Sequence, residues 1–169
     1  RARVVDKDSH EIENNLMKAK NITLFKGRAV FTGMKKLKVG SHELTAEKIL
    51  VAAGTRPSIP KIEGLDKVPY MTSDEALKVE KLPKKLIIIG GGYIACELAH
   101  FFGAMGSKIT ILQRNVKLLP DEDEEISYKF AEIFSKRFDV RLAFPVRKVV
   151  KKGSQIIVYG DEGKSVEGT

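Results

Sequence analysis

Apolar residues between positions 86 and 112 follow the order strand, glycine turn, helix, strand. Leu86–Ile89 is a short, continuous apolar run rich in β-branched residues, which is typical of a buried strand. It stops at Gly90–Gly92, and a helical pattern continues over residues 93–105. A second apolar run, Lys108–Leu112, follows directly. The sequence therefore predicts one βαβ unit with parallel strands.

The glycine turn has a composition that suits a diphosphate. Gly90 allows a sharp turn, and Gly92 has no Cβ, so that the backbone can approach a phosphate closely. Ala95 is small enough for the helix to pack closely on the strand. The helix N-terminus offers free N–H groups and the positive end of its dipole. The pattern predicts a nucleotide site; the alternative is a glycine turn in an α/β domain that binds nothing.

Strands alternate with a helix after Arg114. Asp121 and Glu124 have the spacing of a capping box, which predicts a helix ending at about Arg137. Predicted strands follow at 140–142, 146–150 and 155–159, with a turn at 160–163 and the second strand of a hairpin after it. This alternation predicts an α/β fold with a Rossmann-like three-layer parallel sheet.

Short strands and turns dominate the first half of the chain, where antiparallel pairing is expected. The pattern predicts a helix over residues 9–20 and a hairpin over residues 37–45. Further strands are predicted at 22–25, 29–31 and 48–53, the last with the composition of a buried strand. Residues 57–69 hold three prolines and predict a loop or linker, and Ser73 is the predicted N-cap of a short helix ending at about Glu80.

Composition restricts the class of protein. Of the 169 residues, 43% are hydrophobic and 31% are charged, as in a soluble globular protein. No apolar run reaches the roughly 18 residues of a membrane span and no signal peptide opens the chain, so we expect no membrane contact. Cys96 is the only cysteine, which excludes an internal disulphide and a zinc cluster and favours a reducing, cytoplasmic location. It lies one turn into the predicted helix, where a buried, inert thiol is the expectation and a low-pKa thiol is the alternative.

The formal net charge of +8 raises the alternative of a basic nucleic-acid-binding domain. The lysines are scattered in twos and threes, however, and few aromatic residues lie among them. Solvated surface charge is the simpler interpretation, and we expect no nucleic-acid partner.

Four blocks of sequence, taken in order, resemble an internal segment of the class I flavin-dependent pyridine nucleotide–disulphide oxidoreductases. The blocks are Lys26–Phe31, Ile49–Pro57, Tyr70–Asp74 and Leu82–Glu97. This family includes dihydrolipoamide dehydrogenase, mycothione reductase, mercuric reductase and glutathione reductase. The resemblance covers essentially residues 1–160.

The resemblance implies that the chain contains parts of two domains and that the parent enzyme transfers electrons from a nicotinamide dinucleotide through FAD. Residues 1–80 would be the later part of an FAD-binding domain, and residues 81–169 most of an NAD(P)-binding domain. The parent enzyme would transfer hydride between NAD(P)H and FAD, and then electrons to a disulphide-type acceptor. The family's FAD fingerprint and redox-active cysteine pair would precede Arg1, and its dimerisation domain would follow Thr169. We therefore expect a fragment of a homodimeric enzyme that binds NADPH or NADH weakly and is inactive alone; a nucleotide-binding module without a redox partner is the alternative.

The resemblance also implies the cofactor contacts. Tyr93 and Glu97 would lie at the nicotinamide end, and Val146 against the adenine. The predicted nicotinamide-dinucleotide contacts are Gly90, Gly92, Tyr93, Ile94, Ala95, Glu97, Gln113, Arg114, Lys117 and Val146; the predicted FAD contacts are Arg28, Ala29, Ala53 and Gly54. Simple packing is the alternative for Tyr93, and attraction to the helix dipole is the alternative for Glu97. We expect no catalytic residue and no metal site in this chain.

The end of the second strand predicts which dinucleotide binds. An acid there would bind the ribose 2′-OH and select NAD, but the sequence has the neutral Gln113. Arg114 and Lys117 follow, and a guanidinium can pair bidentately with a 2′-phosphate. We therefore favour NADPH over NADH, with a solvated charge as the alternative for Arg114. The residues do not identify the terminal electron acceptor.

Overall fold

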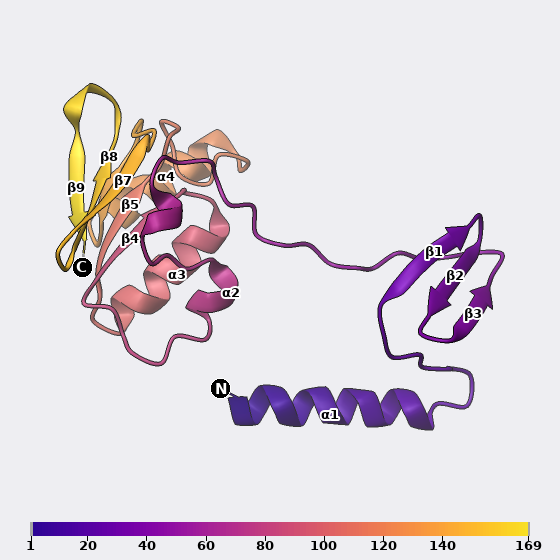
Figure 1. Cartoon of the computed structure of the whole chain (residues 1–169). Helices are drawn as coiled ribbons and strands as arrows, with labels where there is room; N and C mark the ends of the chain where they lie inside the picture. Colours follow the sequence, from indigo (N-terminus) through magenta and orange to yellow (C-terminus); the bar gives the residue numbers. More distant parts are fainter. Residues whose placement is uncertain (1, 169) are drawn as a thin grey trace. The chain divides into compact units, whose positions relative to one another are not determined.

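A computed structural model describes residues 2–168, and the contacts between Cα atoms divide the chain into two compact units, residues 1–54 and 55–169 (Figure 1). Each unit has its own sheet or sheets. The assignment of residues 1–80 to an FAD-binding domain and of residues 81–169 to an NAD(P)-binding domain stays a prediction.

The first unit contains one helix and one antiparallel sheet. The helix α1 (Ala2–Lys18) begins earlier than the predicted one. The strands β1 (Ala29–Gly33), β2 (Lys36–Val39) and β3 (His42–Thr45) pair in sequence order, with Leu37 of β2 opposite both Phe31 and Leu44. The predicted hairpin over residues 37–45 is thus confirmed.

Two strands predicted in this unit are wrong. Residues 22–25 and 48–53 are irregular, and Leu50 is 93% exposed. A strand needs a partner that binds its N–H and C=O groups and covers its side chains. No strand within residues 2–168 pairs with either segment, so their apolar pattern alone does not make them strands.

A parallel sheet is the centre of the second unit. The strands β4 (Lys85–Ile89), β5 (Lys108–Leu112) and β6 (Asp139–Arg141) pair in that order, in parallel. The helix α3 (Tyr93–Ala104) connects β4 to β5, and α4 (Glu124–Ser135) connects β5 to β6. The predicted βαβ unit is confirmed, and the bounds of its second strand are those predicted.

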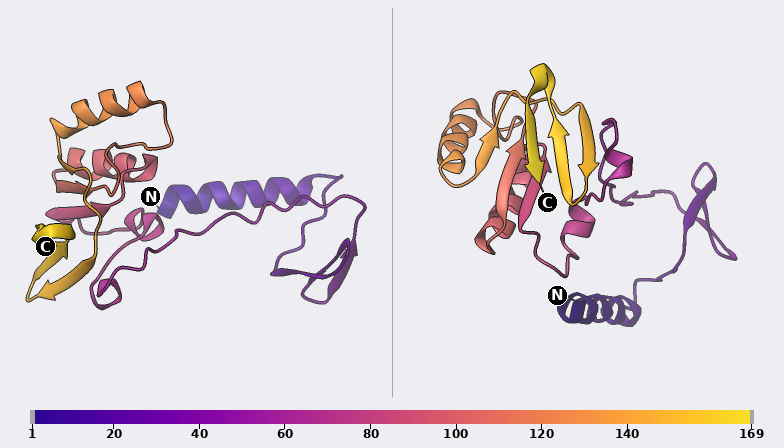
Figure 2. Two further views of the ribbon diagram at one scale, coloured as in Figure 1. Left: turned by 90° about the horizontal axis from the view of Figure 1, so that it is seen from above. Right: turned by 60° about the vertical axis from the view of Figure 1, so that its left-hand side comes forward.

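The remaining strands form a second sheet on the face of the parallel sheet opposite α3 and α4 (Figure 2). They are β7 (Lys148–Lys152), β8 (Gln155–Tyr159) and β9 (Ser165–Gly168), which pair antiparallel in sequence order. The short turn η2 (Asp161–Gly163) connects β8 to β9, and Leu65 of the turn η1 (Leu65–Lys67), which precedes the parallel sheet in the sequence, packs in the same core as Val149 of β7.

Side chains of β5 alternate between two hydrophobic cores, as the pleat requires. Ile109 and Ile111 lie in the helix-side core with Phe102 of α3 and Phe134 of α4. Leu112 lies in the core between the two sheets, with Val149, Val158 and Val166. The predicted three-layer α/β arrangement is confirmed, with one layer made of antiparallel strands.

Several element boundaries in the second unit differ from the predictions, and α2 ends at Ala76 rather than at about Glu80. The helix α2 (Ser73–Ala76) is capped by Thr72, whose Oγ1 accepts a hydrogen bond from the amide of Asp74, and not by Ser73. The N-cap of α4 is Asp123, which accepts from the amide of Glu125 at 2.9 Å, so the capping box predicted from Asp121 is wrong. The strand β7 begins at residue 148 rather than 146.

Within residues 2–168, no helix combines the length and hydrophobicity that a membrane span requires.

Candidate functional site

The turn after β4 leaves open space above its backbone. Gly90 has φ = 113°, a conformation that L side chains rarely adopt, and its amide donates to the carbonyl of Leu112 at 2.9 Å. A Cβ added to Gly90 or to Gly92 would meet no atom within 4 Å. The turn is therefore fixed to β5, while the surface over these two glycines can accept another molecule.

The N-terminus of α3 directs unpaired N–H groups into this space. The N-cap is Gly92, which has no side chain that could bind the first amides of the helix. The first helical bond runs from the amide of Cys96 to the carbonyl of Gly92 at 3.1 Å. The amides of Tyr93, Ile94 and Ala95 precede that bond and have no helical acceptor. Together with the positive end of the helix dipole, they fit a diphosphate group.

Gly91 has a different role, which the sequence did not reveal. A Cβ there would lie 2.7 Å from Cδ2 of Leu118 and 3.1 Å from Cβ of Gln113. The carbonyl of Gly91 accepts a hydrogen bond from the amide of Leu119 at 2.7 Å. Gly91 is therefore required by the packing of the segment that follows β5, which we call the cation loop (residues 113–119).

The cation loop is held to its surroundings along its whole length. At its start, the amide of Gln113 donates to the carbonyl of Arg141 at the end of β6, at 2.9 Å. In the middle, the carbonyl of Asn115 accepts from the amide of Ala143 at 2.9 Å. At its end, the carbonyl of Leu119 accepts from Oγ of Ser127 in α4 at 2.8 Å. The loop backbone is thus ordered by contacts with the segment at the end of β6 and with α4.

The cation loop presents the predicted basic residues and hides the predicted neutral one. Arg114 is exposed and Lys117 is half-buried, and in the described part of the chain neither side chain makes an ion pair or a hydrogen bond. Gln113 is only 4% exposed, and its Nε2 donates to the backbone carbonyl of Lys117 at 3.3 Å. The structure therefore brings the glycine turn and the cation loop together, but it turns the amide of Gln113 into the loop.

The predicted contacts on α3 lie on the exposed side of the helix start. Tyr93 is 66% exposed, Ile94 and Glu97 are also exposed, and Ala95 is half-buried. Cys96 is buried, and burial together with the nearby charge of Glu97 raises the pKa of its thiol to about 11. The expected buried thiol is confirmed, and the alternative of a low-pKa, reactive thiol is wrong.

The other predicted contacts lie apart from this turn in the sequence. Val146 is half-buried against the core between the two sheets. Arg28 and Ala29 lie just before and at the start of β1, and Ala53 and Gly54 lie in the irregular segment after β3. All four are exposed, and their contact with FAD stays a prediction.

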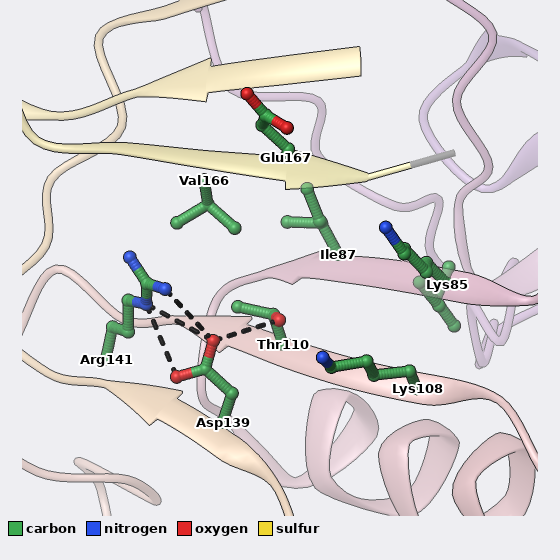
Figure 3. A pocket seen from close by; sticks show the side chains of 9 residues that line it. Lys85, Ile87, Lys108, Thr110, Asp139, Arg141, Val166 and Glu167 are labelled. Atoms are coloured by element: carbon green, nitrogen blue, oxygen red, sulfur yellow. Dashed lines mark hydrogen bonds and ion pairs between the residues drawn. The ribbon is translucent and has the colours of Figure 1, made fainter. Parts of the chain in front are cut away.

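A pocket of about 140 Å³ lies where the parallel strands begin, between them and β9 (Figure 3). Lys85, Lys108 and Asp139, the first residues of β4, β5 and β6, line it, and Asp139 accepts hydrogen bonds from Thr110 and Arg141 at 3.2–3.3 Å. Because parallel strands begin at one edge and end at the other, this pocket is at the edge opposite the glycine turn. It contains none of the predicted cofactor contacts and is smaller than the roughly 300–1,000 Å³ of typical ligand pockets.

Comparisons with known proteins agree with this geometry. A family model described as "Pyridine nucleotide-disulphide oxidoreductase" matches residues 2–169. Mercuric reductase of Lysinibacillus sphaericus is 41% identical over 126 residues, which cover 72% of this chain and 23% of that protein. Mycothione reductase of Mycobacterium tuberculosis is 36% identical over 125 residues, which cover 74% of this chain and 27% of that protein.

The solved structure of the HOCl-induced flavoprotein disulfide reductase RclA from Escherichia coli is similar throughout the chain. It has a TM-score of 0.85 at 31% identity, and the match covers 98% of this chain and 38% of that one. The chain therefore spans well under half the length of each of these relatives.

Proposed function

We propose a function from one premise: the chain belongs to the pyridine nucleotide-disulphide oxidoreductase family. That family is enzymatic and depends on FAD and a pyridine nucleotide. We assign to this chain the binding of a nicotinamide dinucleotide within a flavoprotein disulphide oxidoreductase. When bound, the dinucleotide supplies a hydride that FAD accepts on the way to a disulphide-type acceptor, while residues of this chain bind and orient the dinucleotide.

The single observation that carries this proposal is the surface formed by the glycine turn and the start of α3. Open space above Gly90 and Gly92 meets the amides of residues 93–95, which have no helical acceptor. A diphosphate placed there would accept hydrogen bonds from amides and lie at the positive end of the dipole. Every nicotinamide dinucleotide carries such a diphosphate, so this surface supports binding of NADH and NADPH alike.

The cation loop supports a preference for NADPH. Only NADPH carries a phosphate on the 2′ position of the adenosine ribose, and Arg114 and Lys117 are available to pair with it. The strand end has no acid that would repel this phosphate or bind a free 2′-OH in its place. We therefore propose NADPH as the preferred dinucleotide.

The chain alone is expected to bind the dinucleotide without reducing a disulphide. Cys96 is the only cysteine, it is buried, and its raised pKa keeps the thiol protonated at neutral pH. A thiolate is the form that attacks a disulphide. We propose that the remaining parts of a cytoplasmic, homodimeric enzyme supply the acceptor chemistry, and that Arg28, Ala29, Ala53 and Gly54 contact its FAD.

A titration of the ¹⁵N-labelled chain with NADPH and with NADH tests the proposal. We expect the amide signals of residues 90–95 to shift with both dinucleotides, and those of residues 114–117 to shift further with NADPH. Unchanged signals at the glycine turn under saturating dinucleotide would contradict the proposal. Salt-sensitive binding of duplex DNA that NADPH does not displace would instead support a basic nucleic-acid-binding domain.

A further inference from the structure

Gln113 stands at the position where an acid would select NAD, yet its side chain does not face the surface. It is 4% exposed, less than its neighbours Arg114 and Lys117. We propose that Gln113 is a positioning residue: its side chain holds the cation loop in the shape that pairs with the 2′-phosphate and does not itself contact the ribose. This inference rests on the proposed binding of NADPH and names the residue that organises its specificity.

Gln113 is hydrogen-bonded through its backbone to the end of β6 and the segment after it, and through its side chain to the cation loop. Its backbone amide donates to the carbonyl of Arg141 and its backbone carbonyl accepts from the amide of Phe144, both at 2.9 Å. Both backbone polar groups of Gln113 are therefore hydrogen-bonded to the end of β6 and the residues that follow it. The side-chain Nε2 is left to bridge forward to the carbonyl of Lys117, at 3.3 Å. This bond closes a ring around residues 114–116, the part of the loop that contains Arg114.

The ring needs a side chain of this length that donates a hydrogen bond, because the acceptor is a carbonyl; Nε2 of Gln113 is that donor. Glutamate has the same length but no N–H, and its charge would lie against the carbonyl oxygen. Glutamate would therefore turn outward, to the place where an acid binds a ribose 2′-OH. The absence of a Cβ at Gly91 makes room for the inward position, because that atom would lie 3.1 Å from Cβ and Cδ of Gln113.

A fixed loop shape matters more for NADPH than for NADH. Ordering flexible groups when a ligand binds costs free energy, and ordering them beforehand reduces that cost. The 2′-phosphate is the group that Arg114 and Lys117 would bind, and NADH lacks it. Loosening the loop should therefore weaken NADPH binding selectively, whereas loss of a direct ribose contact would weaken both dinucleotides.

The variant Gln113→Met tests this, because methionine keeps the side-chain length and removes the donor. Gln155→Met is the matched control, since Gln155 is the other glutamine of the chain and lies exposed at the start of β8. We expect Gln113→Met to weaken NADPH binding by about three- to tenfold, the effect of one hydrogen bond, and to leave NADH binding within about twofold. Hydrogen exchange of amides 114–117 should become faster without ligand, while thermal unfolding shows that the chain still folds.

A double variant separates positioning from an independent contact. In the Arg114→Ala background, Gln113→Met should weaken NADPH binding much less than in the wild type, because the two act through one phosphate site. Equal weakening of NADH and NADPH, additive effects of the two substitutions, or unchanged exchange of amides 114–117 would each overturn the positioning role. A wild-type chain that binds neither dinucleotide would instead overturn the proposed function itself.

Discussion

The substitution Gly92→Ala separates dinucleotide binding from folding. Gly92 has φ = −78° and ψ = 179°, which alanine adopts without strain, and its new Cβ would meet no protein atom within 4 Å. The remaining cost to stability is the poorer preference of alanine for the N-cap position, about 0.5–1 kcal/mol. We therefore expect the variant to fold, with a thermal unfolding midpoint lowered by no more than a few degrees.

The effect of Gly92→Ala on binding should be much larger. The added methyl group would occupy the space through which a diphosphate reaches the amides of residues 93–95. A hydrogen bond to a charged group is worth about 1.5–3 kcal/mol, so the loss of one weakens binding by about ten- to a hundredfold. The weakening should be the same for NADPH and NADH, because both carry the diphosphate. Titration of each reduced dinucleotide, followed by its fluorescence, measures the effect.

Two further glycines give the controls. Gly33→Ala makes the same chemical change in the first unit, where the nearest atom to the new Cβ is 3.8 Å away, and should leave binding unchanged. Gly91→Ala places a Cβ 2.7 Å from Leu118 and should cost about 1–3 kcal/mol of stability through overpacking. A well-folded Gly92→Ala chain that binds both dinucleotides as tightly as the wild type would refute the argument.

Three other results are expected. Arg114→Ala should weaken NADPH binding by about tenfold, the effect of a charge-assisted bond at an exposed site, and leave NADH binding unchanged; equal loss for both would contradict a 2′-phosphate role. Iodoacetamide should alkylate Cys96 in the folded chain at least about a hundredfold more slowly than in urea at pH 8, because burial raises its pKa from 9.0 to about 11; similar rates by mass spectrometry would exclude a buried thiol. Lys148 lowers the pKa of Glu63 below its ordinary 4.5, so this pair stabilises the fold above about pH 4.5 and loses its contribution as the pH falls through the lowered pKa. In urea unfolding, Glu63→Gln should therefore lower stability slightly at pH 7 and progressively less as the pH falls below 4.5; a loss that stays constant with falling pH would oppose this.

Local sequence signals were sufficient to predict the βαβ unit. The strand β5 and the start of α3 fall where the apolar pattern and the glycines predict them. These signals are local because a buried strand, a glycine turn and a helix each need a particular run of residues. Local sequence signals did not identify the N-cap of α2, for which Ser73 was predicted and Thr72 is observed. Both residues can cap a helix, and the backbone conformation selects one of them.

Local sequence signals could not predict which distant segments pair with one another. Residues 48–53 have the composition of a buried strand, but a strand forms only when a partner is present to bind its backbone. The same limit applies to the candidate site. Gln113 was correctly placed at the end of a strand, yet its burial depends on a bond to Lys117 and on the missing Cβ of Gly91, more than twenty residues earlier in the sequence.

The glycine turn and the cation loop form one connected surface, and this affects how a dinucleotide would be recognised. The amide of Leu119 donates to the carbonyl of Gly91 at 2.7 Å, and the fully buried Leu118 fills the space beside that glycine. In a dinucleotide, the diphosphate and the 2′ position are separated by a single ribose, so their binding groups need a fixed separation. In the proposed site, the bond between Gly91 and Leu119 would set that separation before a ligand binds and so lower the ordering cost of binding. If the cation loop binds the 2′-phosphate as proposed, the middle glycine of the turn contributes to cofactor choice through the loop that it anchors.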